Sequence, residues 1–261
     1  DLTLAGANTF SGDTTISSGT LILGNSHALQ NSTFNTTSTP LSFVAGSNIY
    51  HLGGLAGSHN VAIAGNHLSV GGNNQSTTYS GIISGTGSLY KTGTGTLTLT
   101  GQNTYSGFTQ LNGGLIEFSS LGNFGPANFL INGGGLKWAA GNTTDISSRV
   151  PYLTNGGITF DTNGNNVSFA NVLANAGGNS GTVTKTGSGI LTLLANNTYT
   201  GSSTISEGTL QIGNGGTSGA IASSSVVNNG ALVFNRADAT AFDGAISGTG
   251  SVAKTGSGTL T

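Results

Sequence analysis

Short runs in which apolar and polar residues alternate recur along the whole chain. A period of two sends Leu97 and Leu99 to one face of a strand and the intervening Thr98 to the other, so one face is core and the other meets water. This pattern predicts short strands at residues 2–4, 20–23, 61–63, 68–70, 97–99, 115–118, 129–131, 136–138, 158–160, 167–169, 191–194, 209–212, 225–227 and 231–234. Between them lie N-G-G, G-G-N-N, T-N-G and S-G-T-G, which supply positive-φ residues and side chains that bond their own backbone. The chain therefore reads as a succession of strands and tight turns.

One long stretch returns in altered form elsewhere in the chain. Residues 85–118 read GTGSLYKTGTGTLTLTGQNTYSGFTQLNGGLIEF, and residues 181–212 read GTVTKTGSGILTLLANNTYTGSSTISEGTLQI. Residues 248–261, GTGSVAKTGSGTLT, repeat the first half, and residues 1–23, DLTLAGANTFSGDTTISSGTLIL, repeat the second half. The chain begins and ends inside a repeat, so we expect it to be a piece of a longer array.

The intervals between equivalent residues are too long for one supersecondary unit. Lys91 and Lys185 are 94 residues apart, Lys185 and Lys254 are 69 apart, and Asn8 and Asn103 are 95 apart. These intervals fit units of several stacked turns of about 20 to 25 residues, with the 69-residue unit lacking one turn. A solenoid can lose a whole coil and still stack, whereas a barrel or sandwich tolerates such a loss poorly.

These intervals also predict how the chain is divided. We expect residues 1–261 to form a single continuous β-helix. Residues 1–84 would end one repeat unit, residues 85–178 and the shorter 179–247 would be further units, and residues 248–261 would begin another.

Parallel stacking is favoured over hairpins because superposing whole turns of similar sequence places like residues above like. Thr, Ser and Asn then form ladders and apolar residues form columns. With turns of this length the chain makes about 11 or 12 rungs, which at a spacing of ~4.8 Å would give a rod about 55 Å long. The handedness of parallel crossovers predicts a right-handed coil.

The composition supports an ordered all-β chain. Gly is present 46 times and only 5% of residues are charged, which leaves little material for solvated amphipathic helices. The 35% hydrophobic content arrives as alternating runs, which argues against disorder.

Charge and cysteine usage exclude several classes of function. The net charge is −2 and the six basic residues are dispersed, so no basic stripe is present and nucleic acid is not an expected partner. No apolar run approaches a spanning helix and no leader peptide is present, so either signal would lie outside this chain. The absence of cysteine means that no disulfide staples the fold and no thiol performs chemistry.

The repeated signature K-T-G-x-G-x-L-T-L, followed by N-T-[YF]-[ST]-G and a G-T-L strand, resembles a known family. It is similar to the autotransporter-associated β-strand repeat, also called the passenger-associated transport repeat, of type V secreted bacterial proteins. The matching stretches are residues 2–23, 91–118, 185–212 and 254–261, about a third of the chain. The resemblance implies a right-handed parallel β-helix in a passenger exported through the outer membrane to the cell surface, with a C-terminal membrane barrel elsewhere in the full-length chain.

The residues of the repeat signature are interpreted as structural. Lysines at 69- to 94-residue intervals would stand about 14 to 20 Å apart, too far to share a small ligand. We expect Lys91, Lys185 and Lys254 to lay their stems over apolar surface at a turn. Each signature asparagine would form a turn and the aromatic residue two positions later would tuck into the coil, which pairs Asn8 with Phe10, Asn103 with Tyr105, and Asn197 with Tyr199.

The carboxylates form no convincing catalytic cluster. A glycoside hydrolase or lyase needs paired carboxylates, or acids that hold a cation beside a basic residue, on adjacent rungs. Asp145 with Arg149, and Arg236 with Asp238 and Asp243, are interpreted as surface pairs. The sequence D-T-N-G-N-N from Asp161 lacks the later Glu of a calcium loop and is interpreted as a tight turn.

The least repeat-like segment, residues 38–74, holds three histidines at intervals of eight residues: His51, His59 and His67. This spacing matches no short metal-ligand motif, so no metal site, cofactor or catalytic residue is expected. A departure from the repeat is nonetheless a place for binding. The candidate surface contacts are therefore these histidines, Tyr50 and Trp138, the single Trp.

Repetition, low charge and the lack of a reactive cluster predict a non-catalytic structural segment of a surface passenger. Such a segment would form a rod-like stalk, support adhesion and contact a host-cell, matrix or glycan surface. Two alternatives stay open: a carbohydrate-active β-helix enzyme, and a self-associating segment of an extracellular filament.

Overall fold

A computed structural model describes residues 1–37, 40–44, 46 and 48–261. The chain forms two compact units, residues 1–130 and residues 131–261, which we describe separately as unit 1 and unit 2. In the part of the chain so described, no helix has the length and apolar character needed to cross a membrane.

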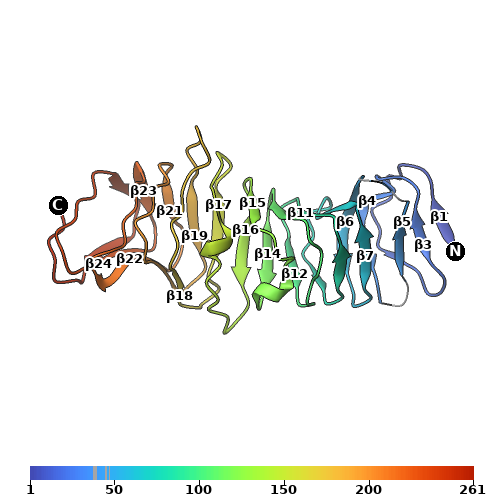
Figure 1. The fold of residues 1–261 in the computed structure, drawn as a ribbon, viewed down its shortest axis with the longest axis horizontal. Helices are drawn as coiled ribbons and strands as arrows, with labels where there is room; N and C mark the ends of the chain where they lie inside the picture. Colours follow the sequence, from blue (N-terminus) through green and yellow to red (C-terminus); the bar gives the residue numbers. More distant parts are fainter. Residues whose placement is uncertain (38–39, 45, 47) are drawn as a thin grey trace. The chain divides into compact units, whose positions relative to one another are not determined.

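Unit 1 consists of short strands and one turn of 3₁₀-helix (Figure 1). The elements are β1 (Leu2–Leu4), β2 (Thr14–Thr15), β3 (Leu21–Leu23), β4 (Leu29–Asn35), β5 (Leu41–Phe43), β6 (Ile49–Ala56), β7 (Val61–Ala64), β8 (His67–Val70), β9 (Thr77–Tyr79), β10 (Ile83–Gly85), β11 (Leu89–Lys91), β12 (Thr96–Leu99), β13 (Thr109–Leu111), β14 (Leu115–Phe118) and η1 (Leu121–Asn123). Strand β15 (Phe129–Ile131) lies where the two units meet along the sequence.

Neighbouring strands along this part of the chain belong to different sheets. Strand β7 pairs with β10, β8 with β11 and β9 with β12, always in parallel. Each strand thus lies over the strand one coil earlier, and each coil has three sides. The sheet that holds β2, β4, β6, β8, β11 and β13 in this order is the longest side within unit 1.

Unit 2 repeats this arrangement with two sheets. Its elements are β16 (Gly135–Trp138), η2 (Ser147–Arg149), β17 (Ile158–Asp161), β18 (Val167–Phe169), β19 (Val183–Thr186), β20 (Ile190–Leu193), β21 (Ser203–Ile205), β22 (Thr209–Gly216), β23 (Ser225–Asn228), β24 (Ala231–Arg236), β25 (Ala245–Ser247) and β26 (Ser251–Lys254). One sheet has the order β16-β17-β19-β21-β23-β25 and the other β18-β20-β22-β24-β26. The third side is carried by isolated parallel bridges such as Leu153 with Asn175 and Asn196 with Ala220.

These pairings confirm the predicted fold class, an all-β parallel β-helix, with about 12 turns along the chain. Each strand predicted from alternation is present within a residue or two of its expected bounds, except that the strand expected at residues 209–212 continues to Gly216 as β22.

The interior of the coils is filled by columns of like residues, as predicted. In unit 1, Leu99 lies in register between Tyr79 and Phe118, and all three side chains are fully buried. In unit 2, Ile212 lies between Leu193 and Phe234. Since buried apolar area stabilises at about 25 cal/mol per Å², these columns supply the main favourable term for stacking.

The rings of Trp138, Phe160 and Phe169 form an aromatic cluster in unit 2. Their centroids lie 5.0 to 6.2 Å apart in tilted and edge-on geometry. Edge and offset contacts are the favourable arrangements for aromatic quadrupoles. This cluster fills part of the coil interior in unit 2.

The expectation that the repeat copies differ by whole turns is wrong in unit 2. Lys185 lies on β19, in the sheet with β21, whereas Lys254 lies on β26, in the sheet with β24. The 69-residue interval therefore spans several coils plus one further side. Similar sequence occupies different sides because a three-sided coil offers each strand-turn unit more than one equivalent place.

Candidate functional site

Lys91, the lysine of the first K-T-G signature, is a core residue. It faces inward on β11, in register between Val70 and Leu111, and its side chain is 1% exposed. Its Nζ donates hydrogen bonds to the carbonyl oxygens of Thr92 at 2.6 Å, Gly93 at 3.3 Å and Gly113 at 3.3 Å. Gly113 lies one coil later, so the ammonium joins the corners of two successive coils.

Lys185 repeats this arrangement in unit 2. It lies on β19 between Phe160 and Ile205 and is fully buried. Its Nζ donates to the carbonyl oxygens of Thr186 at 2.9 Å, Gly187 at 2.6 Å and Glu207 at 3.2 Å. We call each such three-carbonyl site a lysine clamp.

A glycine completes each lysine clamp. Gly114 and Gly208 have φ angles of +56° and +70°, and a Cβ at either position would lie 2.7 Å from the Nζ of Lys91 or Lys185. The corner therefore needs glycine both for its backbone conformation and for the space that the ammonium occupies.

Burial lowers the pKa of both clamp lysines to about 8. At Lys185 the carboxylates of Asp161 and Glu207 oppose this effect and raise the pKa. The three carbonyl oxygens also favour the charged ammonium, which has three protons to donate. Each ammonium group is enclosed and its N–H donors are all engaged. The lysine therefore holds successive coils together and is not placed to attack a substrate.

The sequence predicted that only the stems of the lysines lie over apolar surface, whereas the whole side chains of Lys91 and Lys185 are buried. Lys254 differs. It is exposed, and its Nζ donates to the carbonyl of Gly256 within its own turn. Among the described residues β26 pairs only with β24, so no following coil covers Lys254 or supplies the carbonyl that completes a clamp.

The signature asparagines Asn103 and Asn197 are buried and connect three coils each. The Oδ1 of Asn103 accepts from the backbone N–H of Ile83 at 2.7 Å, and its Nδ2 donates to the carbonyl of Asn123 at 2.6 Å. Asn197 likewise accepts from Leu173 at 2.8 Å and donates to the carbonyl of Ala220 at 2.9 Å.

The aromatic residues that follow are buried as predicted. Tyr105 shares a hydrogen bond with Thr109, with 2.5 Å between the two hydroxyl oxygens, and Tyr199 shares one with Ser203 at 2.7 Å. The hydroxyl groups thus find partners inside the coil, which a buried tyrosine requires. Burial raises the pKa of Tyr199 above its usual range.

Asn8 and Phe10 do not share this arrangement. Asn8 donates to the carbonyl of Ala28 at 3.1 Å, and Phe10 is 45% exposed. The prediction that Phe10 tucks into the coil is therefore wrong. In the described chain β1 pairs with β3 alone, whereas the equivalent strand β12 pairs with both β9 and β14, so no preceding coil covers Asn8 and Phe10.

Two of the predicted surface contacts are core residues instead. Tyr50 is 2% exposed and its hydroxyl donates to the carbonyl of Val44 at 3.2 Å. Trp138 is fully buried and its Nε1 donates to the carbonyl of Thr144 at 2.9 Å. Both rings face the interior because they occupy inward positions of their strands, so neither is available to a ligand.

The three histidines spaced by eight residues lie at separate places in unit 1. His51 stacks on His27 with ring centroids 4.6 Å apart, and His67 lies 5.6 Å from the ring of Tyr90. His59 is exposed between β6 and β7. Across the described residues, no three His, Cys, Asp or Glu side chains come together as a metal site would require.

Three of the carboxylates that the sequence analysis singled out accept hydrogen bonds from backbone N–H groups or from Arg236. Asp145 accepts from the backbone N–H groups of Ser147 at 2.8 Å and Ala170 at 2.9 Å. Asp161 accepts from the backbone of Asn163, whose φ of +48° marks the tight turn that was predicted. Asp238 binds Arg236 through two bonds of 2.8 and 2.7 Å, and this contact holds the pKa of the carboxyl below its usual range.

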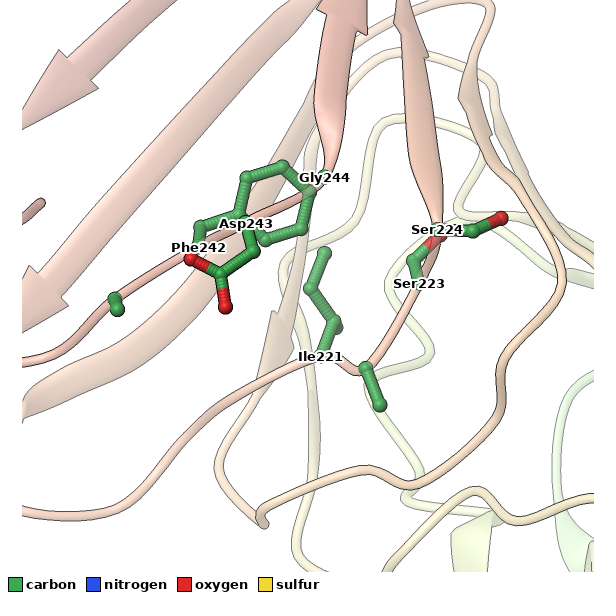
Figure 2. A pocket seen from close by; sticks show the side chains of 8 residues that line it. Ile221, Ser223, Ser224, Phe242, Asp243 and Gly244 are labelled. Atoms are coloured by element: carbon green, nitrogen blue, oxygen red, sulfur yellow. The ribbon is translucent and has the colours of Figure 1, made fainter.

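A hollow in unit 2 lies between the segments at residues 221–224 and 241–244 (Figure 2). It measures about 270 Å³, and Asp243 and Phe242 line it opposite Ile221 and Ser223. The Oγ of Ser223 already donates to backbone carbonyls and accepts from Ser203, so it is committed to the coil. With one carboxylate among its lining residues, the hollow lacks the pair that glycoside hydrolysis uses.

Two adjoining hollows lie on the outer face of the long sheet of unit 1, and we call them together the groove. They measure about 280 and 270 Å³ and share His51, Ser69 and Thr92. Ser69 is almost fully buried and forms the floor.

The two ends of the groove carry similar side chains. One end continues past Tyr90 to Gln110 and Asn112, and the other past His27 to Gln30. Of the residues that line the groove, the sequence analysis had named only His51 as a candidate contact. The signal that was available is the outward position of Tyr90 between inward Leu89 and Lys91 on β11.

The segments that carry these signature residues also match a known family of repeats. The family model described as passenger-associated-transport-repeat matches residues 1–23, 89–117 and 183–212. These stretches hold both lysine clamps and both buried asparagine–tyrosine pairs. These three stretches are therefore passenger-associated transport repeats.

A curated relative is the adhesin BmaC autotransporter of Brucella suis biovar 1 (strain 1330). It is 42% identical over 179 residues, which cover 68% of this chain and 5% of the relative. The chain thus spans about 5% of the length of this relative. No solved structure matches the chain.

Proposed function

We propose that the chain is a non-catalytic structural segment of an autotransporter passenger, which serves as a stalk and supports adhesion at the bacterial surface. We further propose that residues 1–261 form one continuous β-helix in a longer chain exported with the help of a C-terminal membrane barrel. The relative described as an adhesin supports the adhesive part of this proposal.

The observation that supports the proposal is the set of hydrogen bonds that the signature residues make. Lys91, Lys185, Asn103 and Asn197 direct their polar atoms to backbone groups of neighbouring coils. Residues that recur with the repeat therefore maintain stacking. A sequence selected for stacking is what a passenger stalk needs, since each coil provides the surface on which the next one forms.

The constellation closest to catalytic machinery is Asp161 and Glu207 near Lys185, on three successive coils. Both carboxylates influence the pKa of this lysine. Lys185 is fully buried, however, and its ammonium is held by three carbonyls. A substrate would have to open the coil to reach it, which favours the structural proposal over the enzyme alternative.

Incubation of the purified chain with pectin-like, alginate-like and host-type glycans, with and without calcium, tests the non-catalytic part. We expect no product by mass spectrometry. Turnover that is lost in Lys185→Met would overturn the proposal.

The adhesive part is tested in bacteria that display the full-length passenger. Removal of the segment that corresponds to this chain should reduce attachment to host cells or matrix while the rest of the passenger still reaches the surface, as followed by antibody labelling. Unchanged attachment at equal surface display would contradict the role in adhesion.

A further inference from the structure

The groove in unit 1 combines flat rings with neutral hydrogen-bonding groups. At one end His27 and His51 stack at 4.6 Å, and further along the sheet Tyr90 lies against His67 at 5.6 Å. Tyr90 and His51 are half-buried, so one face of each is held by the protein while the remainder lies open. Rings fixed in this way form stacking platforms at little cost in side-chain entropy.

The amide groups at the ends of the groove are held in place. The Nε2 of Gln110 donates to the Oδ1 of Asn112 at 2.8 Å, and the Nε2 of Gln30 donates to the backbone carbonyl of Asn8 at 3.3 Å. Thr92 adds a hydroxyl in the centre, where its Oγ1 donates to the carbonyl of Val70 at 3.2 Å. An amide or hydroxyl group can both donate and accept, so these side chains suit a ligand rich in hydroxyl groups.

The lining of the groove carries no Asp, Glu, Lys or Arg side chain. Lys91 belongs to the same strand as Tyr90, but its ammonium lies inside the coil. Burial and the neighbouring His27 lower the pKa of His51, which keeps this imidazole neutral at pH 7. A charged ligand would find no carboxylate, ammonium or guanidinium group in the groove, whereas an uncharged polar ligand would bury no unpaired charge of its own.

The groove also has a regular internal spacing. Its lining side chains come from the parallel strands β6, β8, β11 and β13, with His27 and Gln30 added at the β4 end. Adjacent strands of a sheet are about 4.8 Å apart. His51 and Tyr90 both lie in register with Ser69 on the strand between them, so their rings are two strand spacings apart. An extended chain of sugar rings repeats on a scale similar to one strand spacing, so alternate sugar rings can meet the two protein rings while the ring between them lies over Ser69.

We propose that the groove of unit 1 binds an uncharged oligosaccharide, which lies across the strands with sugar rings against Tyr90 and the His27–His51 pair and hydroxyl groups on the amides of Gln110 and Gln30. This inference rests on the proposed adhesive role and names its ligand class. The hollow in unit 2 has Asp243 in its wall and lacks both the stacked rings and the amide rim.

The test is a glycan microarray probed with the whole chain and followed by titration calorimetry. The probes are short neutral hexose oligosaccharides and their sialylated or sulfated counterparts. We expect binding of neutral members, weakened about tenfold in Tyr90→Ala, which corresponds to ~1.4 kcal/mol. Gln110→Ala should weaken binding several-fold, and Tyr90→Phe should retain most of it because the ring remains.

Tyr152→Ala is the matched control, because Tyr152 is 59% exposed in unit 2 and lies outside the groove. It should bind as the unchanged chain does, and circular dichroism should show that every variant keeps its strands. The inference is overturned by binding of charged glycans alone, by capture of protein ligands without glycan, by no binding, or by binding that Tyr90→Ala leaves intact.

The experiments distinguish a failure of this inference from a failure of the proposed function. Attachment that depends on the segment while no neutral glycan binds overturns the groove and leaves the adhesive role. Binding followed by cleavage of the glycan overturns the non-catalytic role and leaves the groove as a glycan site.

Discussion

At the scale of single residues, the polar members of the repeat signature are buried because each one satisfies backbone groups that the coil corners leave without partners. A buried carbonyl without a partner costs about 1 to 3 kcal/mol. Lys91 satisfies carbonyls of Thr92, Gly93 and Gly113 together. The sequence predicted a structural role for the signature lysines, but not their burial, since lysine is rarely found in a core.

The lysine clamp can be tested by truncation of Lys91. Lys91→Ala leaves three carbonyls without their donor and a cavity between Val70 and Leu111, so we expect the free energy of unfolding to fall by about 2 to 4 kcal/mol. Lys91→Met retains the volume and should cost less. Urea denaturation gives these values. The exposed Lys254 is the control, and Lys254→Ala should change stability by less than about 0.5 kcal/mol; equal losses at the two positions would contradict the clamp.

The buried asparagine can be tested through one backbone amide. In Asn197→Ala the N–H of Leu173 loses its acceptor, so we expect its hydrogen exchange to accelerate and the chain to lose about 2 kcal/mol of stability. Exchange measured by nuclear magnetic resonance reports both effects. Asn8→Ala serves for comparison, since Asn8 makes a single longer bond to Ala28. If Leu173 stays as protected as before, the buried amide contributes little.

At the scale of strands, alternation predicted many of the strands whose inward positions are aliphatic or aromatic. Among the strands that it missed are β11, β13, β19 and β21, where the inward positions include Lys91, Thr109, Lys185 and Ser203. These buried polar residues face inward, so inward and outward positions still alternate along the strand. The sequence, however, no longer alternates between apolar and polar residues. A period-two search therefore overlooks the strands that carry the lysine clamps, although it finds others in the same sheets, such as β8 beside β11 and β17 beside β19.

Strand β6 shows how closely two coils can approach. A Cβ on Gly53 would lie 2.4 Å from the backbone carbon of Asn31 on β4, so Gly53→Ala forces the strands apart. We expect a loss of about 1 to 3 kcal/mol in the free energy of unfolding. Gly216→Ala, on β22 with open space around the position, should be neutral or slightly stabilising. Thermal unfolding of both variants shows whether β4 and β6 are closely packed at Gly53 or tolerate an added Cβ there.

At the scale of the whole molecule, the family and the parallel β-helix could be predicted from sequence, whereas the groove of unit 1 could not. Repetition reveals stacking because every coil obeys the same rule. The groove assembles His27, His51, Tyr90 and Gln110 from coils of unequal length, and outward positions follow no hydrophobic pattern. The copies of the repeat also begin in different sheets, since Lys91 lies on β11, Lys185 on β19 and Lys254 on β26, which belong to three separate sheets.

The dependence of stability on pH is a further property of the whole fold, and unit 2 allows it to be measured. Trp138 is the only tryptophan and is buried in this unit against Phe160 and Phe169, so its fluorescence reports on the unfolding of unit 2. Burial lowers the pKa of Lys185 to about 8 from its ordinary value of 10.5. Between these values the unfolded chain retains a proton that the folded chain has released, so the free energy of unfolding rises with pH.

We therefore expect the urea-derived free energy of unfolding of unit 2 to increase by about 2 to 3 kcal/mol from pH 8 to pH 10, since each pKa unit corresponds to about 1.4 kcal/mol. Below pH 8 both states carry the proton and this contribution is constant. Above pH 10 the raised pKa of Tyr199 acts in the opposite direction, because the unfolded chain then loses a proton that the folded chain keeps. Lys185→Met has no proton to release and should show no rise over this window, whereas Lys254→Met should follow the unchanged chain. A rise that persists in Lys185→Met would assign the effect to another group, and a steady fall in the unchanged chain would mean that the three carbonyls hold the ammonium charged well above pH 8.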